Sequence, residues 1–274
     1  MNHAMNETHG KLENLKSSLI ELGSVAIAFS GGVDSTFLLE VAHQTLGDKV
    51  IALTARSGLY PVRELDEARA FAVCRGIRHV IYDLDELNID GFAENPVNRC
   101  YLCKTNLFGT FRKMADENGF AHLAEGSNVD DDGDYRPGLK AIKELDILSP
   151  LKDAGLTKPE IRILSKEMKL PTWEKPSFAC LASRFPYGET ITREKLHAID
   201  VSEQLLFDMG FKQVRVRHHG NFARIEVNLD EMNRLLSPET REVVYAGIKK
   251  VGFAYVAVDL QGYRTGSMNE TIKK

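Results

Sequence analysis

Residues 25–35 read VAIAFSGGVDS, and this stretch decides the fold class. Its first five residues are apolar, a run that is typical of a strand buried in a parallel sheet. The two adjacent glycines allow a tight backbone turn. After the turn, Phe37, Leu38 and Val41 recur at helical spacing, and Gly47 is a stop signal for that helix. A strand, a tight turn and a helix are the parts of an open α/β sheet, and such sheets bind ligands at the turn.

The same alternation of strands and helices continues downstream. The helix that begins at Thr157 has a capping box with Glu160. A proline-rich loop at 171–189 closes the first domain, which we place at residues 1–184. The alternation predicts an α/β fold, a parallel sheet with helices on both faces. Helices are expected at 61–74, 101–117 and 157–170, and strands at 49–54, 79–84 and 121–124.

Beyond that loop the order of the elements changes. Residues 218–221, His-His-Gly-Asn, are expected to form a hairpin connection between two predicted strands, with His218 and His219 as turn residues. Residues 185–274 are therefore predicted to form a smaller α+β domain. Its expected elements are helical stretches at 193–209 and 230–250 and strands at 213–218, 223–227 and 255–260.

The composition is that of a soluble globular protein. The 274 residues carry a net charge of −4, and 43% of them are hydrophobic while 27% are charged. This balance argues against a nucleic acid as partner, and no apolar run is long enough for a membrane span. The N-terminus lacks the features of a secretory signal, and four cysteines are too few for a disulfide scaffold. We therefore expect a cytoplasmic protein with reduced thiols.

The turn at residues 30–35 has the chemistry of a phosphate site. Amides at the start of the following helix point outward, and the helix dipole favours negative charge there. The hydroxyls of Ser30 and Ser35 can donate to phosphate oxygens, and Asp34 can hold Mg²⁺ against them. The nucleotide motifs GxxxxGK[ST] and GxGxxG are both absent. Asp131 lies in the acidic run 130–132, which is either a second Mg²⁺ ligand set or a solvated loop.

The motif SGGVDS resembles the PP-loop of the ATP pyrophosphatases, which include GMP synthetase, NAD synthetase and tRNA thiolases. These enzymes split ATP into AMP and pyrophosphate while a substrate oxygen attacks the α-phosphate. The resemblance implies a PP-loop fold of the adenine nucleotide alpha hydrolase type, with ATP and Mg²⁺ as cofactors. It also implies nucleotide contacts from Ser30, Gly31, Gly32, Asp34, Ser35, Thr54, Arg56, Gly126, Ser127 and Asn128.

Three of the four cysteines form a second pattern. Cys100 and Cys103 are a Cys-x-x-Cys pair near a helix start, and Cys180 follows within PSFACLASR. Three thiolates without an obvious fourth ligand suit a [4Fe–4S] cluster with one iron open for chemistry. A zinc site with a fourth ligand and a redox disulfide stay open as alternatives. Cys74, inside a predicted helix, is expected to be a small buried hydrophobe.

Three stretches together are similar to the LarE family across almost the whole chain: SGGVDS, KPSFACLASRFPYGE and RVRHHGNFARIEV. LarE proteins are ATP-dependent sulfur transferases in the synthesis of the nickel-pincer cofactor of lactate racemase. The resemblance implies that the chain adenylates the carboxylates of pyridinium-3,5-biscarboxylic acid mononucleotide and replaces an oxygen of each with sulfur. Its partners would be that small molecule and inorganic sulfide or another sulfur donor, and we expect a homo-oligomer.

The LarE family obtains its sulfur in two ways. In one, the cysteine that matches Cys180 gives up its own sulfur and becomes dehydroalanine. In the other, three cysteines hold a [4Fe–4S] cluster whose open iron carries an exogenous sulfide. Because Cys100, Cys103 and Cys180 are all present, the resemblance favours the cluster as third cofactor, with sacrificial transfer from Cys180 as the alternative.

Charged residues of the second domain are candidates for substrate binding. Arg215 and Arg217 alternate on one predicted strand and face the same side, and Arg224 on the next strand can join them. Arginine forks suit the phosphate of a mononucleotide, and the alternative is a solvated basic face. The candidate catalytic residues are Asp34, Cys180, Arg184 and Glu203, the last either as general base or as structural partner.

Three other functions would use part of the same motifs. A tRNA thiolase also combines a PP-loop with a Cys-x-x-Cys pair, but its partner calls for a basic surface interleaved with aromatic residues. An amidating synthetase would leave the three cysteines without a task. A nucleotide sensor or sulfur carrier would bind ATP without turnover, and pyrophosphate release separates it from an enzyme.

Overall fold

The computed structural model describes residues 2–133, 137–176 and 178–271, and the chain divides into two compact units. Unit 1 comprises Met1–Asp85 and Asn98–Phe178, and unit 2 comprises Glu86–Val97 and Ala179–Lys274. Each unit has its own sheet, so each is described by itself.

The division differs from the expected boundary between residues 184 and 185. Residues 179–184 belong to unit 2 because Arg184 forms a fully buried ion pair with Glu203. Residues 86–97 also belong to unit 2, where the side chain of Asn95 donates to the carbonyl of Pro186 at 2.6 Å. Sequence order alone gives no signal for this second exchange between the units.

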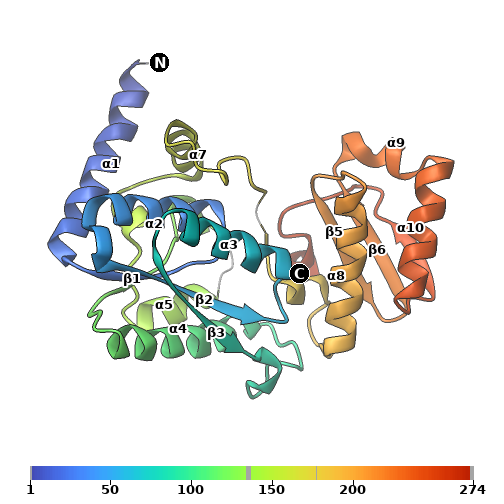
Figure 1. Ribbon diagram of the computed structural model, residues 1–274. Helices are drawn as coiled ribbons and strands as arrows, with labels where there is room; N and C mark the ends of the chain where they lie inside the picture. Colours follow the sequence, from blue (N-terminus) through green and yellow to red (C-terminus); the bar gives the residue numbers. More distant parts are fainter. Residues whose placement is uncertain (1, 134–136, 177, 272–274) are drawn as a thin grey trace. The chain divides into compact units, whose positions relative to one another are not determined.

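A four-stranded parallel sheet forms the centre of unit 1, in the order β3-β2-β1-β4 (Figure 1). The predicted α/β class with a parallel sheet is therefore confirmed. The strands are β1 (Val25–Ala28), β2 (Val50–Ser57), β3 (Arg78–Leu84) and β4 (Leu123–Ala124). The helices are α1 (Asn2–Leu22), α2 (Val33–Leu46), α3 (Val62–Cys74), α4 (Arg99–Glu117), α5 (Gly138–Glu144), α6 (Pro150–Asp153) and α7 (Lys158–Glu167), with 3₁₀ turns η1 (Gly47–Lys49) and η3 (Val129–Gly133).

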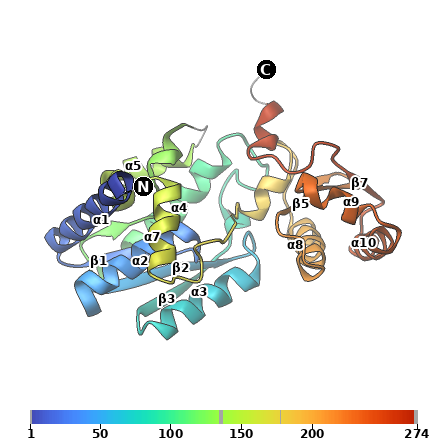
Figure 2. The same cartoon turned by 90° about the horizontal axis from the view of Figure 1, so that it is seen from above.

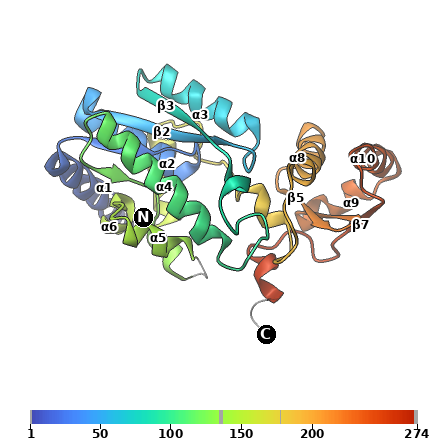
Figure 3. The ribbon, with the colours of Figure 1, turned by 90° about the horizontal axis from the view of Figure 1, so that it is seen from below.

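Helices cover both faces of this sheet. Val25 and Ile27 of β1 pack into one apolar core with α1, α2 and α7, whereas Ala26 packs into the other core with α4 and α5. This alternation follows from the two-residue period of a strand. Figure 3 shows α4 and α5 over the second face. No helix within the described ranges is long and apolar enough to span a membrane.

The N-terminal helix α1 is missing from the sequence-based prediction, which begins at residue 25. Leu12, Leu15 and Leu19 of this helix are buried in the core with α2. Their spacing of three and four residues is the helical signal that was available. Gly10 and a largely polar sequence around it obscured that signal.

Unit 2 contains a three-stranded sheet in the order β5-β6-β7, with β5 antiparallel and β7 parallel to β6. The predicted helical stretch 230–250 is broken because Pro238 cannot continue a helix, and Ser237 caps a new one there. The strands are β5 (Val214–His219), β6 (Phe222–Val227) and β7 (Tyr255–Val258). The helices are α8 (Arg193–Asp208), α9 (Met232–Leu235) and α10 (Pro238–Lys250), and the 3₁₀ turns are η2 (Glu86–Asn88), η4 (Leu181–Arg184), η5 (Leu229–Glu231) and η6 (Ser267–Thr271).

The hairpin expected at residues 218–221 is present, but the expectation that His218 and His219 are turn residues is wrong. Both are the last residues of β5, paired with Ala223 and Phe222 of β6. The turn lies one step later, at Gly220, whose φ of 59° suits a glycine. His218 is buried, and its ring stacks on Phe185 with centroids 5.1 Å apart.

Candidate functional site

The loop between β1 and α2 lies at the carboxyl end of the parallel sheet. We call residues 29–35 the nucleotide loop. Gly31 has a φ of 70°, and a Cβ there would lie 3.1 Å from the Cβ of Ala68. Both its conformation and its surroundings therefore require a glycine. The hydroxyls of Ser30 and Ser35 are 3.0 Å apart across the loop, so the turn presents its hydroxyls together.

The segment after β4 packs directly on this loop. A Cβ on Gly126 would lie 3.0 Å from the backbone nitrogen of Ser35, so only glycine allows this approach. Ser127 and Asn128 are both buried beside it. The hydroxyl and backbone N–H of Ser127 donate to Glu125, at 2.8 and 3.1 Å, and hold the segment in place. The structure thus brings 126–128 and the nucleotide loop together, as the resemblance implies.

Asp34 is the acidic group of the nucleotide loop, and two side chains bind it. The Nδ2 of Asn128 donates to one carboxylate oxygen at 3.4 Å. The ammonium of Lys158 forms an ion pair with the other oxygen. Lys158 is the first residue of α7, after the Thr157–Glu160 capping box that the sequence predicts. The sequence analysis missed Lys158, although a lysine at the start of a helix near the carboxyl end of the sheet was a usable signal.

A second lysine, Lys175, binds the backbone of the nucleotide loop. Its ammonium donates to the carbonyl of Gly31 at 3.1 Å. It also lies 2.8 Å from Glu64 and 2.6 Å from Glu67, both on α3. Lys175 is the first residue of the stretch KPSFACLASRFPYGE that carries the family resemblance, but it was not expected to be a site residue. Three acceptors hold this ammonium, so it fixes the loop rather than projecting from it.

Thr54 of β2 forms a hydrogen bond with the first residue of the nucleotide loop. Its buried hydroxyl donates to the carbonyl of Phe29 at 2.6 Å and accepts from Nε2 of His79 at 2.8 Å. Burial, followed by the charge of Arg69, lowers the pKa of His79 to about 4. His79 is therefore neutral near pH 7, with its proton on Nε2.

Two further candidates from the sequence lie at the surface of unit 1. The guanidinium of Arg56 pairs with the exposed carboxylate of Asp83, with Nη2 and Oδ2 2.6 Å apart. The half-buried Asp131 accepts from the backbone N–H of Asn128 at 3.0 Å, which places its carboxylate beside the residue that binds Asp34. Asp131 and Asp34 thus share Asn128 as a hydrogen-bond donor.

The cysteines divide between the two units. Cys100 and Cys103 are half-buried in the first turns of α4, and their spacing of three residues puts them on one helix face. Cys180 is half-buried in unit 2, directly before η4. Cys74 is exposed at the end of α3, so the expectation of a buried residue is wrong. In the part of the chain that the structure describes, no group of three or more His, Cys, Asp or Glu is placed to hold a metal ion.

A buried ion pair lies next to Cys180 in the sequence and contacts its backbone. Arg184 and Glu203 are both 0% exposed and share two hydrogen bonds of 2.8 and 2.7 Å. The Nη1 of Arg184 also donates to the carbonyls of Ala179 and Cys180, at 2.7 and 3.2 Å. Glu203 accepts in addition from the backbone N–H of Val216 at 2.9 Å. The pair therefore joins the cysteine segment, α8 and β5.

The arginines of β5 and β6 share one face of the sheet, as the alternation predicts. Arg217 lies opposite Arg224, and Arg215 lies opposite Glu226. Arg217 forms a two-pronged ion pair with the buried Glu226, at 3.0 and 2.7 Å. Burial, and next the charge of Arg184, lower the pKa of Arg215 to about 10. The sequence analysis missed Glu226, which alternates with Arg224 on the same strand.

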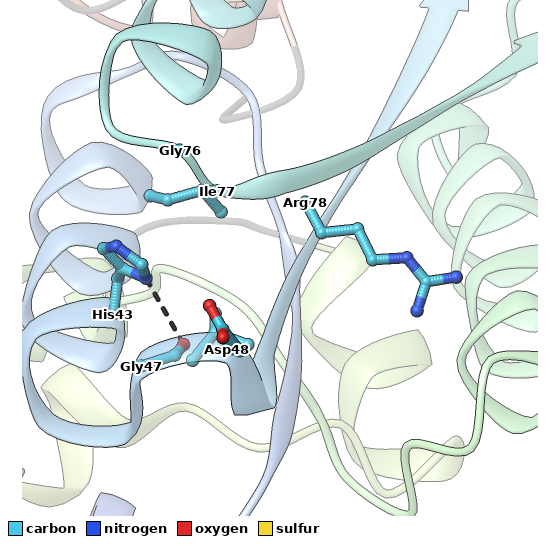
Figure 4. Close-up of a pocket in the computed structure, with 7 residues that line it drawn as sticks. His43, Gly47, Asp48, Gly76, Ile77 and Arg78 are labelled. Carbon is cyan, nitrogen blue, oxygen red and sulfur yellow. Dashed lines mark hydrogen bonds between the residues drawn. The ribbon is translucent and has the colours of Figure 1, made fainter.

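A cavity of about 220 Å³ lies at the opposite, amino-terminal edge of the sheet in unit 1 (Figure 4). His43, Asp48 and Arg78 line it, and Nδ1 of His43 lies 3.3 Å from the carbonyl of Gly47. None of the residues that the sequence analysis proposed for the site contributes to this cavity.

Known proteins resemble the chain over both units, although no protein-family model matches it. The chain is 40% identical to an uncharacterized protein of Synechocystis sp., slr1717, over 96% of this chain and 98% of that protein. It is 37% identical to the pyridinium-3,5-bisthiocarboxylic acid mononucleotide synthase of Lactiplantibacillus plantarum, over 96% of this chain and 95% of the synthase. A more limited match, 29% identical over 67% of this chain and 63% of the relative, is to one subunit of the glutamine-hydrolyzing GMP synthase of Thermoplasma volcanium.

Proposed function

The chain belongs to the LarE family, as does the pyridinium-3,5-bisthiocarboxylic acid mononucleotide synthase, and from that membership we propose that it is an ATP-dependent sulfur transferase. Its proposed substrate is pyridinium-3,5-biscarboxylic acid mononucleotide, and its product carries thiocarboxylates in place of the carboxylates. The observation that carries the proposal is the nucleotide loop with Asp34 between Asn128 and Lys158.

In this proposal the nucleotide loop holds the β- and γ-phosphates of ATP. The outward amides of the first turn of α2 and the hydroxyls of Ser30 and Ser35 donate to the phosphate oxygens. Asp34, with Asp131 beside it, ligates Mg²⁺ through carboxylate oxygens. When Mg²⁺ takes the carboxylate of Asp34, the ammonium of Lys158 is released from its ion pair and turns to the phosphates.

The proposed chemistry activates a poor leaving group. A substrate carboxylate oxygen attacks the α-phosphorus of ATP, the bond from that phosphorus to pyrophosphate breaks, and an acyl adenylate forms. A sulfur nucleophile then adds to the acyl carbon, and AMP leaves with the former carboxylate oxygen. The loop and Mg²⁺ stabilise the negative charge that develops on the departing pyrophosphate.

For the sulfur source we propose a [4Fe–4S] cluster ligated by Cys100, Cys103 and Cys180. What supports this assignment is the chemistry of the donors, since none of the three cysteines forms a disulfide or is fully buried, and two of them share one helix face. When bound, the cluster supplies an open iron that carries sulfide. Arg184 holds the backbone of Cys180 through its carbonyl, and Glu203 holds Arg184. We assign this pair to the positioning of Cys180.

The substrate phosphate is proposed to bind at the arginine face of Arg215, Arg217 and Arg224. Arg224 is the most exposed of the three, with 33% of its side chain accessible. Arg217 is held by Glu226 and by the hydroxyl of Ser267 at 3.0 Å, so it supplies a fixed rather than a mobile positive charge. A fixed guanidinium suits the planar recognition of phosphate.

The test follows the fate of ATP. Anaerobically prepared protein is incubated with Mg·ATP, sulfide and the dicarboxylate mononucleotide, and phosphorus products are separated. The proposal expects AMP and pyrophosphate, formed only when the acid is present. Formation of ADP and orthophosphate, or no turnover, would contradict it.

The same samples test the sulfur source. If the cluster is the sulfur source, we expect four irons per chain and an unchanged mass of Cys180 after turnover. If Cys180 gives up its own sulfur, we expect little iron and the conversion of Cys180 to dehydroalanine. Cys100→Ser lowers turnover under the first mechanism and has little effect under the second.

A further inference from the structure

Helix α1 lies against α7, and their contact centres on Glu160 (Figure 2). One carboxylate oxygen of Glu160, Oε1, accepts from the ammonium of Lys11 at 2.8 Å and from the hydroxyl of Thr8 at 3.3 Å. The other oxygen, Oε2, accepts from the N–H and hydroxyl of Thr157, at 2.9 and 2.8 Å. The same carboxylate therefore binds both the N-terminal helix and the cap of α7.

The cap of α7 leads directly to the nucleotide loop. Lys158 follows Thr157, and its backbone N–H donates to Asp130 at 2.8 Å. Its ammonium reaches Asp34, while Asn128 binds the other oxygen of the same carboxylate. The first turn of α7 is thus held at three points, by Asp130, by Asp34 and, through Glu160, by Lys11.

The ion pair of Lys11 with Glu160 is largely shielded from solvent, so it can hold the two side chains in a fixed orientation. The side chains of Lys11 and Glu160 are 22% and 17% exposed, whereas the pair of Lys16 with Glu13 on the outer side of α1 is 36% and 68% exposed. A sheltered, short ion pair holds a carboxylate more firmly than an exposed one. Without the ammonium of Lys11, Glu160 Oε1 keeps only the longer bond from Thr8, so the carboxylate is held to α1 less firmly and its position depends on the two bonds that Oε2 accepts from Thr157.

We propose that Lys11 and Glu160 are positioning residues that direct the ammonium of Lys158 at the phosphates of ATP. This inference rests on the proposed function, because it assigns Lys158 to the nucleotide phosphates. It gives α1, whose apolar face is buried against α2, a role in catalysis through its polar face.

The test compares three probes of the loop in variants of the full chain. Dissociation constants for Mg·ATP, Mg·pyrophosphate and AMP are measured by calorimetry for the wild type and for Lys11→Met. The variant is expected to bind Mg·ATP and Mg·pyrophosphate about fivefold to tenfold more weakly, which is less than the loss of a whole charge-assisted hydrogen bond because the ammonium of Lys158 is misdirected and not removed. AMP, which lacks those phosphates, is expected to bind as before.

Further variants separate positioning from general damage. Lys11→Arg is expected to restore affinity, and Lys16→Met, the matched change on the same helix, is expected to leave it unchanged. In a Lys158→Met background, Lys11→Met is expected to have no additional effect, because the group that it positions is gone. Thr8→Val is expected to give a smaller loss with the same selectivity.

Each contrary result overturns the inference. Equal weakening of AMP and Mg·ATP would show that α1 only stabilises the fold, and additive losses in the double variant would show that Lys11 acts independently of Lys158. A wild type that binds Mg·ATP and releases pyrophosphate while Lys11→Met behaves identically refutes the positioning role alone. A wild type that does not bind Mg·ATP refutes the proposed function and this role with it.

Discussion

The two units carry their charges in different ways. Around the nucleotide loop of unit 1 the cations are lysines, and the pair of Lys158 with Asp34 is 26% and 22% exposed. Beside Cys180 in unit 2 the cation is an arginine, and the pair of Arg184 with Glu203 is 0% exposed on both sides. A lysine ammonium is a single point charge that can change partners, whereas an arginine fork is held by two parallel hydrogen bonds.

This difference separates charges that act on a ligand from charges that hold a framework. A partly exposed pair is worth little to stability, so a bound cation or phosphate can replace either partner at small cost. A fully buried pair cannot lose one partner without leaving an uncompensated charge in the interior. The nucleotide loop of unit 1 therefore has charges suited to exchange, and the pair of Arg184 with Glu203 in unit 2 is suited to fixing a segment.

The largest expected effect is on the stability of unit 2. Glu203→Gln leaves the guanidinium of Arg184 buried without its counter-charge, and the free energy of unfolding is expected to fall by about 3–5 kcal/mol. Chemical denaturation measures it, with Glu13→Gln on the exposed side of α1 as the control. Replacing both members by Arg184→Met and Glu203→Leu is expected to recover much of the loss. A loss below about 1 kcal/mol for the single change would remove the contrast with unit 1.

The next effect is on turnover and not on stability. Asp34→Asn removes the carboxylate proposed to bind Mg²⁺, and the rate of pyrophosphate release is expected to fall about 100-fold. Its unfolding midpoint is expected to stay near that of the wild type, because the pair with Lys158 is partly exposed. Asp48→Asn, in the cavity at the other edge of the sheet, is the matched control and is expected to keep the wild-type rate. A stability loss comparable to that of Glu203→Gln would show that Asp34 is a framework charge.

A smaller effect depends on pH and arises beneath the nucleotide loop. Burial and Arg69 lower the pKa of His79 from 6.5 to about 4, so the unfolded chain binds more protons between these two values. Stability is therefore expected to fall as pH decreases from 6.5 to 4, by roughly 1–2 kcal/mol after allowance for solvent screening. His79→Gln, which retains a donor to Thr54, is expected to lose that part of the pH dependence. Burial also lowers the pKa values of His218 and His219, so these residues contribute to the pH dependence of stability in the same range. The contribution of His79 is therefore measured as the difference in pH dependence between the wild type and His79→Gln. Identical slopes would contradict the assignment.

The smallest effect is at the surface of unit 1. Arg56→Ala breaks a two-pronged pair with Asp83, but both side chains are exposed, at 57% and 71%. We expect no measurable change in the denaturation midpoint, despite hydrogen-bond geometry similar to that of Arg184 with Glu203. A midpoint shift as large as that of Glu203→Gln would show that burial is not what distinguishes the two units.

Local patterns predicted much of the fold of unit 1, including the turn on which its candidate site is built. The apolar run 25–29 and the glycines after it predict a strand, a turn and a helix, and these are local properties of the chain. The alternation of Arg215 and Arg217 likewise places them on one face of a strand. The sequence did not identify Lys158, Lys175 or Glu226, because their importance comes from which distant residues they meet.

The same reasoning explains two errors about burial and turns. The exposure of Cys74 depends on which face of α3 meets the sheet, and a single helix pattern near its end does not determine that. His218 and His219 look like turn residues beside Gly220, yet tertiary packing of His218 on Phe185 and Phe253 extends the strand through them. In both cases contacts distant in sequence overrode a local preference.

The exchange of residues 86–97 into unit 2 constrains how this protein can be taken apart. The polypeptide crosses from one unit to the other after Asp85, after Val97 and after Phe178, so no single cut yields both units whole. A fragment that stops at Phe178 would retain residues 86–97 without the rest of unit 2. A chimaera joined at a single junction would combine residues of two parent proteins within unit 2. Modular engineering or recombination of this scaffold therefore needs paired breakpoints that transfer the short excursion together with the C-terminal part.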